Sequence, residues 1–307
     1  MSATKISGRS KATLHSQRST HVPKARTEQR RVSRLLIISR NAGSMTPEVE
    51  AMLRKEFADY LTIDFDPKQD FEKLITPRAT VVVAGGDGSV EFVVRKLAES
   101  KHPLGILSLG TFNNFAHALG LPTDLKEMVK VAKQGHPKAI TLGRVNGCYF
   151  IEACAIGLFG ETIALGESAK DMEFGKLGPR LRNVLTAPRF KYELTGDIKG
   201  SGTAMSLVFS NTSSFGSKLP VSDATPVEPY LEFSVHAGRT RTDIVGRAVA
   251  SAVLRKHAED DAQVFKFRRL EVTTQPKVRI YADNYMVGRT PATVTAEVSA
   301  LRVMLPR

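Results

Sequence analysis

The feature that most constrains this chain is a unit of strand, small-residue turn and helix that occurs three times within residues 34–120. Each unit starts with a short apolar run of the kind that forms a buried strand, and the run ends in a turn rich in Gly, Ser, Asn or Asp. The predicted strands are residues 35–39, 79–84 and 104–109, and the predicted helices are residues 47–60, 89–100 and 113–119. Because strands that alternate with helices pair in parallel, we predict an α/β domain with an open parallel sheet over residues 34–141.

Strand-like segments predominate after residue 141. Many short strands separated by Gly, Pro and Ser are typical of an antiparallel sandwich or barrel. The sequence therefore predicts an all-β second domain over residues 142–294. Its predicted strands are residues 149–155, 204–210, 231–237, 269–274, 277–282 and 293–305, and two helices are predicted at residues 176–186 and 243–256.

The net charge of +13 is concentrated in residues 1–33, which hold eight Lys or Arg residues and one Glu. This segment has no apolar periodicity, which favours a disordered basic arm. A basic arm is attracted to polyanions, either an anionic membrane surface or nucleic acid, and the sign of the charge does not choose between them. A solvated tail and an organellar transit peptide also stay open.

Composition excludes several protein classes. No apolar run approaches the roughly 18 residues that cross a bilayer, and no apolar segment follows a charged start as in a secretory signal. The two cysteines, Cys148 and Cys154, fit no zinc spacing and are too few for a disulfide scaffold. We expect a cytoplasmic protein that associates with membranes at most peripherally.

The turn after the second predicted strand combines glycines with a carboxylate, Asp87, at the carboxyl edge of the sheet, where open α/β folds bind ligands. Glycines let backbone amides approach phosphate oxygens, and the start of the following helix favours an anion. The Ser89 hydroxyl can donate to a phosphate. A carboxylate beside phosphates needs either Mg²⁺ to hold or a proton to accept, although a simple helix cap also explains Asp87. The glycines of this turn are Gly85, Gly86 and Gly88.

A second turn of small residues follows the next strand within Pro103–Ala116, where Thr111 and Asn113 can bond phosphate, ribose or base. The first strand adds Gly43 and Ser44. Turns on adjacent strands form a cleft, so these residues are candidates for nucleotide binding. The chain contains neither the G-x-x-x-x-G-K-[ST] P-loop nor the G-x-G-x-x-G dinucleotide fingerprint.

These paired motifs resemble a known family. Gly85–Ser89 is similar to the GGDGT motif, and Pro103–Ala116 to the PxGTxNxxA motif, of the diacylglycerol kinase catalytic domain family, which includes bacterial lipid kinases and, more distantly, the sphingosine and ceramide kinases. The resemblance extends over residues 35–307. It continues through Val145–Phe150, Ala155–Leu158, Ser210-Asn211 with Gly216, Tyr281–Asp283 and Ala300–Pro306.

The resemblance implies an ATP-dependent lipid kinase that phosphorylates a hydroxyl of a diacylglycerol-like or sphingoid lipid at a membrane surface. It implies Mg²⁺ with ATP, a nucleotide-binding first domain and a lipid-binding second domain, with a final strand at about residues 295–307 that returns to the first. A carboxylate takes the proton of the lipid hydroxyl, for which Asp87 and Asp283 are the candidates, and Asp87 is also the candidate metal ligand. The matched nucleotide contacts are Gly43, Ser44, Gly85, Gly86, Gly88, Ser89, Thr111 and Asn113.

Departures from the family pattern bear on activity. The family usually has D-G-E where this chain has Asp283-Asn284-Tyr285, and a tyrosine with a pKa near 10 is a poor base at neutral pH. Val227–Leu231 also lacks the D-D-G motif of the family's structural Mg²⁺ site, which puts that site in question. Smaller departures are Ser39 in place of Asn, Ser89 in place of Thr, and Asn114 in place of Asp or His.

Alternatives to a working lipid kinase stay open. The departure at Tyr285 favours a catalytically weak or inactive nucleotide- or lipid-binding member of the same family. An NAD kinase also has a GGDG turn, but it is expected to carry an Asn-Glu pair that this chain lacks. Specific nucleic-acid binding would depend on the basic arm alone and is not expected. A homodimer is compatible with the sequence.

Overall fold

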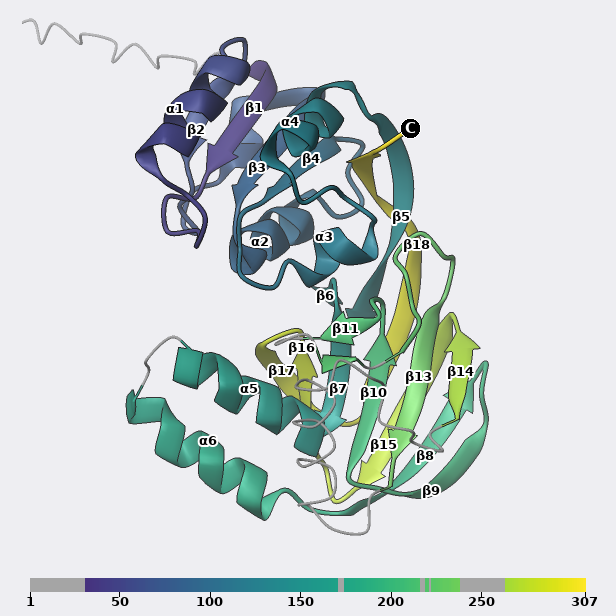
Figure 1. The fold of residues 1–307 in the computed structure, drawn as a ribbon. Helices are drawn as coiled ribbons and strands as arrows, with labels where there is room; N and C mark the ends of the chain where they lie inside the picture. The colour runs from purple at the N-terminus through teal and green to yellow at the C-terminus, as the bar shows by residue number, and fades with distance from the viewer. Residues whose placement is uncertain (1–30, 171–173, 216–218, 221, 238–262) are drawn as a thin grey trace, which may run out of the picture. The chain divides into compact units, whose positions relative to one another are not determined.

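The computed structural model of the chain describes residues 31–170, 174–215, 219–220, 222–237 and 263–307 (Figure 1). Residues 1–30 of the predicted basic arm and the predicted helix at 243–256 lie outside the described residues. The last residues assigned to the arm already belong to the fold, because the first strand begins at Val32.

The first part of the chain forms the predicted α/β domain. Strands β2, β1, β3 and β4 lie in that order, and all three neighbouring pairs are parallel. The elements are β1 (Val32–Ile38), α1 (Pro47–Glu56), β2 (Leu61–Asp64), the 3-10 helix η1 (Phe71–Leu74), β3 (Ile75–Gly85), α2 (Asp87–Leu97), β4 (Pro103–Ser108), α3 (Asn114–Ala118) and α4 (Leu125–Gln134).

Helices cover both faces of this sheet because its central strands contain continuous apolar runs, residues 35–38 of β1 and 81–84 of β3. Alternate side chains of a strand point to opposite faces. Val81 and Val83 pack with Val94 of α2. Val82 and Ala84 instead pack in a separate cluster with α1 and α4. Strands buried on both faces are typical of parallel sheets, and their carboxyl ends meet at one edge.

The second part of the chain is rich in antiparallel strands, as predicted. One sheet of six strands has the order β14-β13-β10-β7-β16-β17. The elements are β5 (His136–Val145), β6 (Cys148–Phe150), β7 (Ala153–Gly157), α5 (Leu158–Lys170), α6 (Phe174–Thr186), β8 (Phe190–Gly196), β9 (Gly200–Ala204), β10 (Ser206–Ser210), β11 (Ser214–Phe215), β12 (Leu219–Pro220), β13 (Leu231–His236), β14 (Val264–Phe267), β15 (Arg269–Gln275), β16 (Arg279–Ala282), β17 (Tyr285–Arg289) and β18 (Ala292–Leu305).

A second sheet faces the first across a shared apolar core. Phe209 and Phe233 of the six-stranded sheet pack in one cluster with Leu194 of β8, Leu270 of β15 and Val294 of β18. This is a two-layer arrangement of β-sheets. The predicted fold class, an α/β domain with a parallel sheet followed by an antiparallel β domain, is confirmed.

Strand β18 connects the two parts of the fold. It pairs antiparallel with β15, and near its end Val303 pairs in parallel with Leu104 of β4. It also pairs with β5 along most of its length. The four strands β1–β4 and six strands of the second part (β5, β6, β8, β9, β15 and β18) therefore form a single mixed sheet of ten strands.

One predicted strand, residues 149–155, is divided in the structure into β6 and β7. The interruption falls at Ile151 and Glu152. Their backbone N–H groups and that of Ala153 donate to the carboxylate of Asp283 and not to a neighbouring strand. A long-range contact therefore breaks a segment that is apolar enough to be continuous.

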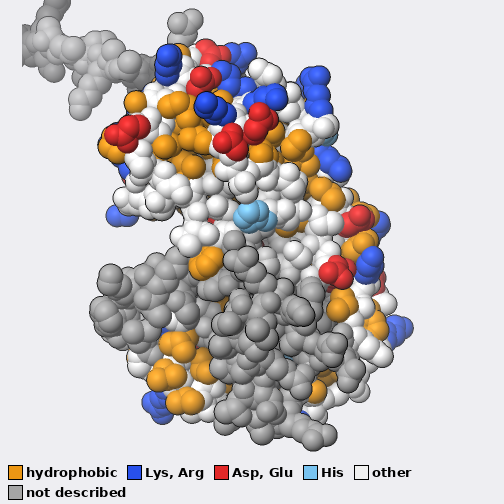
Figure 2. All heavy atoms as spheres, in the orientation of Figure 1, with side chains coloured by type: hydrophobic (Ala, Val, Ile, Leu, Met, Phe, Trp, Pro, Cys, Tyr) orange, Lys and Arg blue, Asp and Glu red, His pale blue; other side chains and the backbone are white. Residues whose placement is uncertain are grey.

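Helix α5 packs against the six-stranded sheet, and α6 lies side by side with α5 (Figure 1). Phe159 and Ile163 of α5 pack on β7 and β10, and Val184 of α6 packs against Leu158. Figure 2 shows hydrophobic side chains gathered on the outer surface over α6. Within the part of the chain that the structure describes, each helix is too short or too polar to span a membrane.

Candidate active site

The turns that follow β1, β3 and β4 meet at the carboxyl edge of the parallel sheet. The Ser39 N–H donates to the Ala84 carbonyl at 2.8 Å, and the Leu109 N–H donates to the Gly85 carbonyl at 2.8 Å. The Ser44 N–H donates to the Leu109 carbonyl at 3.0 Å. These backbone bonds hold the three predicted turns together as one surface.

The turn after β4 lies directly against the turn after β3, and this contact explains Gly110. A Cβ atom on Gly110 would lie 2.8 Å from Asp87 Oδ2, 2.8 Å from Asn113 Oδ1 and 2.9 Å from the Gly86 Cα. Real Cβ atoms do not approach other heavy atoms so closely, so any side chain at Gly110 would force the turns apart. Glycine is required here by the close approach of two backbones.

Gly85 serves a similar purpose on the other side of the same turn. A Cβ atom there would lie 2.8 Å from the Ser89 Cβ and 3.1 Å from the Ser39 Cβ. The Ser89 side chain is buried in this contact, so its predicted hydroxyl bond to a phosphate stays a prediction. Gly88 has open space where a side chain would be.

The N-terminus of α2 faces this edge. Gly86 caps the helix with an extended backbone, and α2 runs for 11 residues from Asp87. The first N–H groups of a helix have no partner within it, and the helix dipole adds positive potential there. Together with the exposed Gly88, this supplies amide donors that a phosphate group requires.

Two other predicted nucleotide contacts, Thr111 and Asn113, differ in whether their side chains are already hydrogen-bonded within the loop. Thr111 lies beside the first turn, with its hydroxyl oxygen 3.7 Å from the place of a Gly43 Cβ. The Asn113 side chain instead braces its own loop, because its oxygen accepts from the Gly110 N–H at 2.9 Å and its amide nitrogen donates to the Gly110 carbonyl at 3.0 Å. A left-handed backbone at Asn113, with φ of 52°, places the side chain in this position.

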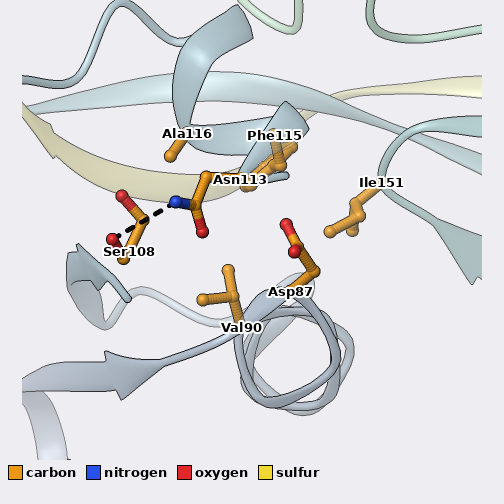
Figure 3. Close-up of a pocket in the computed structure, with 7 residues that line it drawn as sticks. All are labelled: Asp87, Val90, Ser108, Asn113, Phe115, Ala116 and Ile151. Atoms are coloured by element: carbon orange, nitrogen blue, oxygen red, sulfur yellow. Dashed lines mark hydrogen bonds between the residues drawn. The ribbon is translucent and has the colours of Figure 1, made fainter. Parts of the chain in front are cut away.

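Asp87 lines a small pocket between the turns (Figure 3). Figure 3 shows its carboxylate directed toward the space between Asn113, Phe115 and Ile151. Asp87 is the one acidic side chain among the described residues that line this pocket, and it is half-buried. An accessible carboxylate beside a set of amide donors can accept a proton or bind a cation.

Asp283 is placed differently from Asp87. It lies in the turn between β16 and β17 with φ of 49° and is 3% exposed. Its carboxylate accepts from three consecutive backbone N–H groups, those of Ile151 at 2.9 Å, Glu152 at 2.9 Å and Ala153 at 3.2 Å. A fourth donor is Arg95 Nη2, at 3.2 Å from Oδ2. With this set of donors, Asp283 joins the β16–β17 turn to α2 and to the start of β7.

Glu91 and Arg95 lie on the same face of α2 as Asp87, further along the helix. Arg95 Nη2 lies 2.6 Å from Glu91 Oε1, and the guanidinium lies 5.1 Å from the ring centre of Tyr285. Tyr285 therefore rests on Arg95 in a cation–π contact. Sequence reasoning missed Glu91 and Arg95, although their spacing of four and eight residues from Asp87 puts all three on one helix face.

Burial dominates the electrostatics of this network. Burial and the nearby charge of Asp283 raise the pKa of Glu91 well above its ordinary value. Burial also raises the pKa of Asp283, against the opposing effect of Arg95 and the three backbone donors. One cation thus lies between two buried acids, a setting that favours keeping one of them protonated.

Glu152 is a further buried acid that the sequence did not single out. Its carboxylate accepts from the Asn114 side-chain amide at 3.2 Å, and the Asn114 oxygen accepts from the Ser214 hydroxyl at 3.2 Å. Asn114, in the position often held by Asp or His in the resembled family, thus connects α3 to β11 and to the β6–β7 break.

The side chains at this site fit Mg²⁺ only if the phosphates of the nucleotide supply further ligands. In the described residues, no three His, Cys, Asp or Glu side chains gather closely enough to hold a metal ion. Mg²⁺ is usually bound through one or two carboxylates together with substrate phosphates, and Asp87 is placed for that role. The segment Val227–Leu231 is instead fixed by Thr141, whose hydroxyl donates to the Glu228 carbonyl at 2.6 Å.

Comparisons with known proteins agree with the motifs. Residues 35–145 match the model of the family described as "Diacylglycerol kinase catalytic domain". A diacylglycerol kinase from Bacillus subtilis is 25% identical over 237 residues, which are 74% of this chain and 78% of that protein. The resemblance derived from the two glycine motifs is confirmed.

Solved structures share the fold. The crystal structure of a diacylglycerol kinase from Bacillus anthracis superposes with a TM-score of 0.67 at 21% identity, over 89% of this chain and 97% of that one. An NAD kinase from Archaeoglobus fulgidus, solved in complex with ATP, gives a TM-score of 0.53 at 11% identity, over 89% of this chain and 93% of that one. At these identities the likeness establishes the architecture alone.

Proposed function

Because residues 35–145 match the model of the diacylglycerol kinase catalytic domain, we propose that this chain is an ATP-dependent lipid kinase. Its substrate is a diacylglycerol-like or sphingoid lipid, and the reaction takes place at a membrane surface. The observation that carries the proposal is the contact of three small-residue turns around Asp87, with Gly110 lying against Gly86 and Asp87.

In this proposal the triphosphate of ATP lies along the carboxyl edge of the sheet. The amides at the start of α2 and the turn at Gly43 and Ser44 bind the phosphates, and Thr111 contributes its hydroxyl. Asn113 keeps the turn after β4 in shape, since its side chain is engaged with Ser108 and Gly110. Rigid amide donors of this kind stabilise charge without reorganising during the reaction.

The chemistry is transfer of the γ-phosphoryl group to a lipid hydroxyl. The hydroxyl oxygen forms a bond to the γ-phosphorus, the bond from that phosphorus to the β–γ bridging oxygen breaks, and ADP leaves. Asp87 receives the hydroxyl proton. If Asp87 instead holds the Mg²⁺ that accompanies ATP, the proton passes to an oxygen of the transferred phosphoryl group. Bound Mg²⁺ supplies neutralisation of the phosphate charge. Asp283 holds the β16–β17 turn in place, because four donors already surround its carboxylate.

The decisive experiment measures ATP consumption with diacylglycerol or sphingosine in mixed micelles. Wild type is expected to consume ATP only when lipid is present. An Asp87→Ala variant is expected to lose this lipid-dependent ATP consumption. Equal lipid-dependent turnover in both proteins would reject the proposal. NAD is included as an alternative acceptor, because the fold is shared with an NAD kinase, and phosphorylation of NAD alone would also reject it.

A second candidate is a nucleotide- or lipid-binding member of the family without activity. Tyr285 favours it, because the ring lies on Arg95 in the place where the family usually has an acid. If wild type binds ATP but is silent with every lipid, and a Tyr285→Glu variant gains turnover, the second candidate is correct.

The basic arm is assigned to the membrane in this proposal. Residues 1–33 would hold the protein near anionic lipids through their charge. Deleting residues 1–30 should lower binding to anionic vesicles while ATP affinity stays unchanged.

A further inference from the structure

The outer face of α6 exposes two large apolar side chains one turn apart. Leu181 is 47% exposed and Leu185 is 61% exposed. Residues four apart lie on the same face of a helix. On the inward face of α6, Val184 packs with Ala187 and Leu158. The two exposed leucines therefore contribute little to the core.

The surroundings of these leucines are strongly basic. Residues 174–191 contain five Lys or Arg residues and no Asp or Glu. One open hollow beside α6 is lined by Arg182 and by Arg279, which is paired with Glu161. Arg189 and Lys191, which follow α6 in the chain, line another hollow. Figure 2 shows the hydrophobic side chains over α6 with a Lys or Arg side chain beside them.

We propose that α6 is a docking surface for an anionic lipid bilayer, with Leu181 and Leu185 entering the acyl region and the neighbouring arginines contacting lipid phosphates. The inference rests on the proposed function and names the surface through which that function reaches its substrate. An apolar helix face bordered by Lys and Arg is the composition of helices that lie in the membrane interface. A second copy of the chain is a poor occupant, because two surfaces with this excess of positive charge repel each other.

The surface is joined to the active site by a short continuous segment. Helix α5 begins at Leu158, directly after β7, and α6 packs on α5. The first residue of β7, Ala153, is one of the three backbone donors to Asp283. Docking through α6 would therefore place the lipid surface at a fixed position relative to the β16–β17 turn.

The chain has no tryptophan, so a single Leu185→Trp substitution reports on its own surroundings through fluorescence. The test adds vesicles of phosphatidylglycerol or of phosphatidylcholine to the full chain. A blue shift with phosphatidylglycerol alone is expected. The matched control is Leu61→Trp, since Leu61 is an exposed leucine on β2 (41%), and no shift is expected there.

Three outcomes would overturn the proposal. One is sedimentation of the protein with phosphatidylglycerol vesicles without a shift at Leu185→Trp, which would assign binding to another segment such as the basic arm. Another is a shift that depends on protein concentration without vesicles, which would identify a second copy as the occupant. The third is failure of the full chain to bind the vesicles at all.

Activity separates this inference from the proposed function. A Leu181→Gln/Leu185→Gln double variant should lose about tenfold in phosphorylation of long-chain diacylglycerol in vesicles, and it should retain activity on a monomeric short-chain diacylglycerol. Equal loss on both substrates would contradict a docking role. If wild type phosphorylates neither substrate, the proposed function fails, while the fluorescence shift still decides whether α6 docks.

Discussion

Asp87 and Asp283 are both candidate proton acceptors by sequence, but their surroundings differ in the structure. Asp87 is half-buried at the edge of a pocket. Asp283 is 3% exposed and is surrounded by three backbone donors and Arg95. A carboxylate can act on a substrate only if its oxygens are accessible. The comparison teaches that the same residue type can leave its oxygens accessible at the edge of a pocket in one region and have them fully hydrogen-bonded in the other.

The largest effect is expected from removing the accessible carboxylate. An Asp87→Asn variant should lose lipid-dependent turnover about a thousandfold, because it can neither accept a proton nor hold Mg²⁺. Its free energy of unfolding should stay within about 0.5 kcal/mol of wild type. Steady-state kinetics and urea unfolding measure the two quantities, and a large loss of stability would remove the distinction between the two aspartates.

The opposite pattern is expected at the buried aspartate. An Asp283→Asn variant would turn an amide toward groups that are themselves donors, so its free energy of unfolding should fall by about 3 kcal/mol. The control is Asp66→Asn, because the exposed Asp66 carboxylate accepts a local bond from the Lys68 N–H at 2.8 Å. An Asp283→Asn protein that keeps wild-type stability and loses only turnover would make Asp283 the reactive group.

The contact of the two turns can be tested at Gly110. A Gly110→Ala variant should lose about tenfold in ATP affinity, because the new methyl group meets Asp87, Asn113 and Gly86 at 2.8–2.9 Å. Gly200→Ala is the matched control, because a Cβ atom added at Gly200 would have no other heavy atom within 4 Å. Calorimetric titration with ATP measures both, and unchanged affinity in Gly110→Ala would show that the nucleotide does not use this edge.

The smallest effect is expected from the acid next to Arg95. A raised folded-state pKa means that the folded protein holds the Glu91 proton more tightly than the unfolded chain does. The stability that comes from this tighter proton binding is fully present below the ordinary pKa of Glu. It is lost as the pH rises through the pKa of Glu91 in the folded protein. A Glu91→Gln variant keeps its neutral form, so its melting temperature should exceed that of wild type by a few degrees at pH 8 and by less at pH 5.

The control for this pH dependence is Glu127→Gln, which changes an exposed acid that pairs with Lys130 on α4. Its melting temperature should follow wild type at both pH values. A Glu91→Gln advantage that is the same at pH 5 and pH 8 would contradict the assigned pKa direction.

Short-range patterns explain why part of the fold and site was predictable. The β1, β3 and β4 strands and their glycine turns follow from residues that are neighbours in the chain, and the helix predicted at 176–186 lies within α6. Helices α4 and α5 and strand β5 were not predicted. The periodicity of α5 is weak because one side packs on the sheet and another on α6.

Long-range contacts explain what could not be predicted. Nothing near Asp283 in the sequence indicates that its carboxylate meets the amides of residues 151–153, about 130 positions away. Likewise, the steric need for glycine at position 110 comes from Gly86 and Asp87 at the start of α2, in the turn after another strand. Only the charged face of α2 could have been predicted from the sequence, because Asp87, Glu91 and Arg95 follow one another at a spacing of four residues.

The pairing of β18 with β4 has a consequence for how the protein can be handled and divided. Residues 35–145 are the segment that a domain map would select for expression alone, yet in the full chain the edge of β4 is covered by Arg302 and Val303. An excised segment would leave that strand with unsatisfied backbone groups and β5 without its partner, both of which invite aggregation. The boundary of the sequence family is therefore not a boundary of autonomous folding.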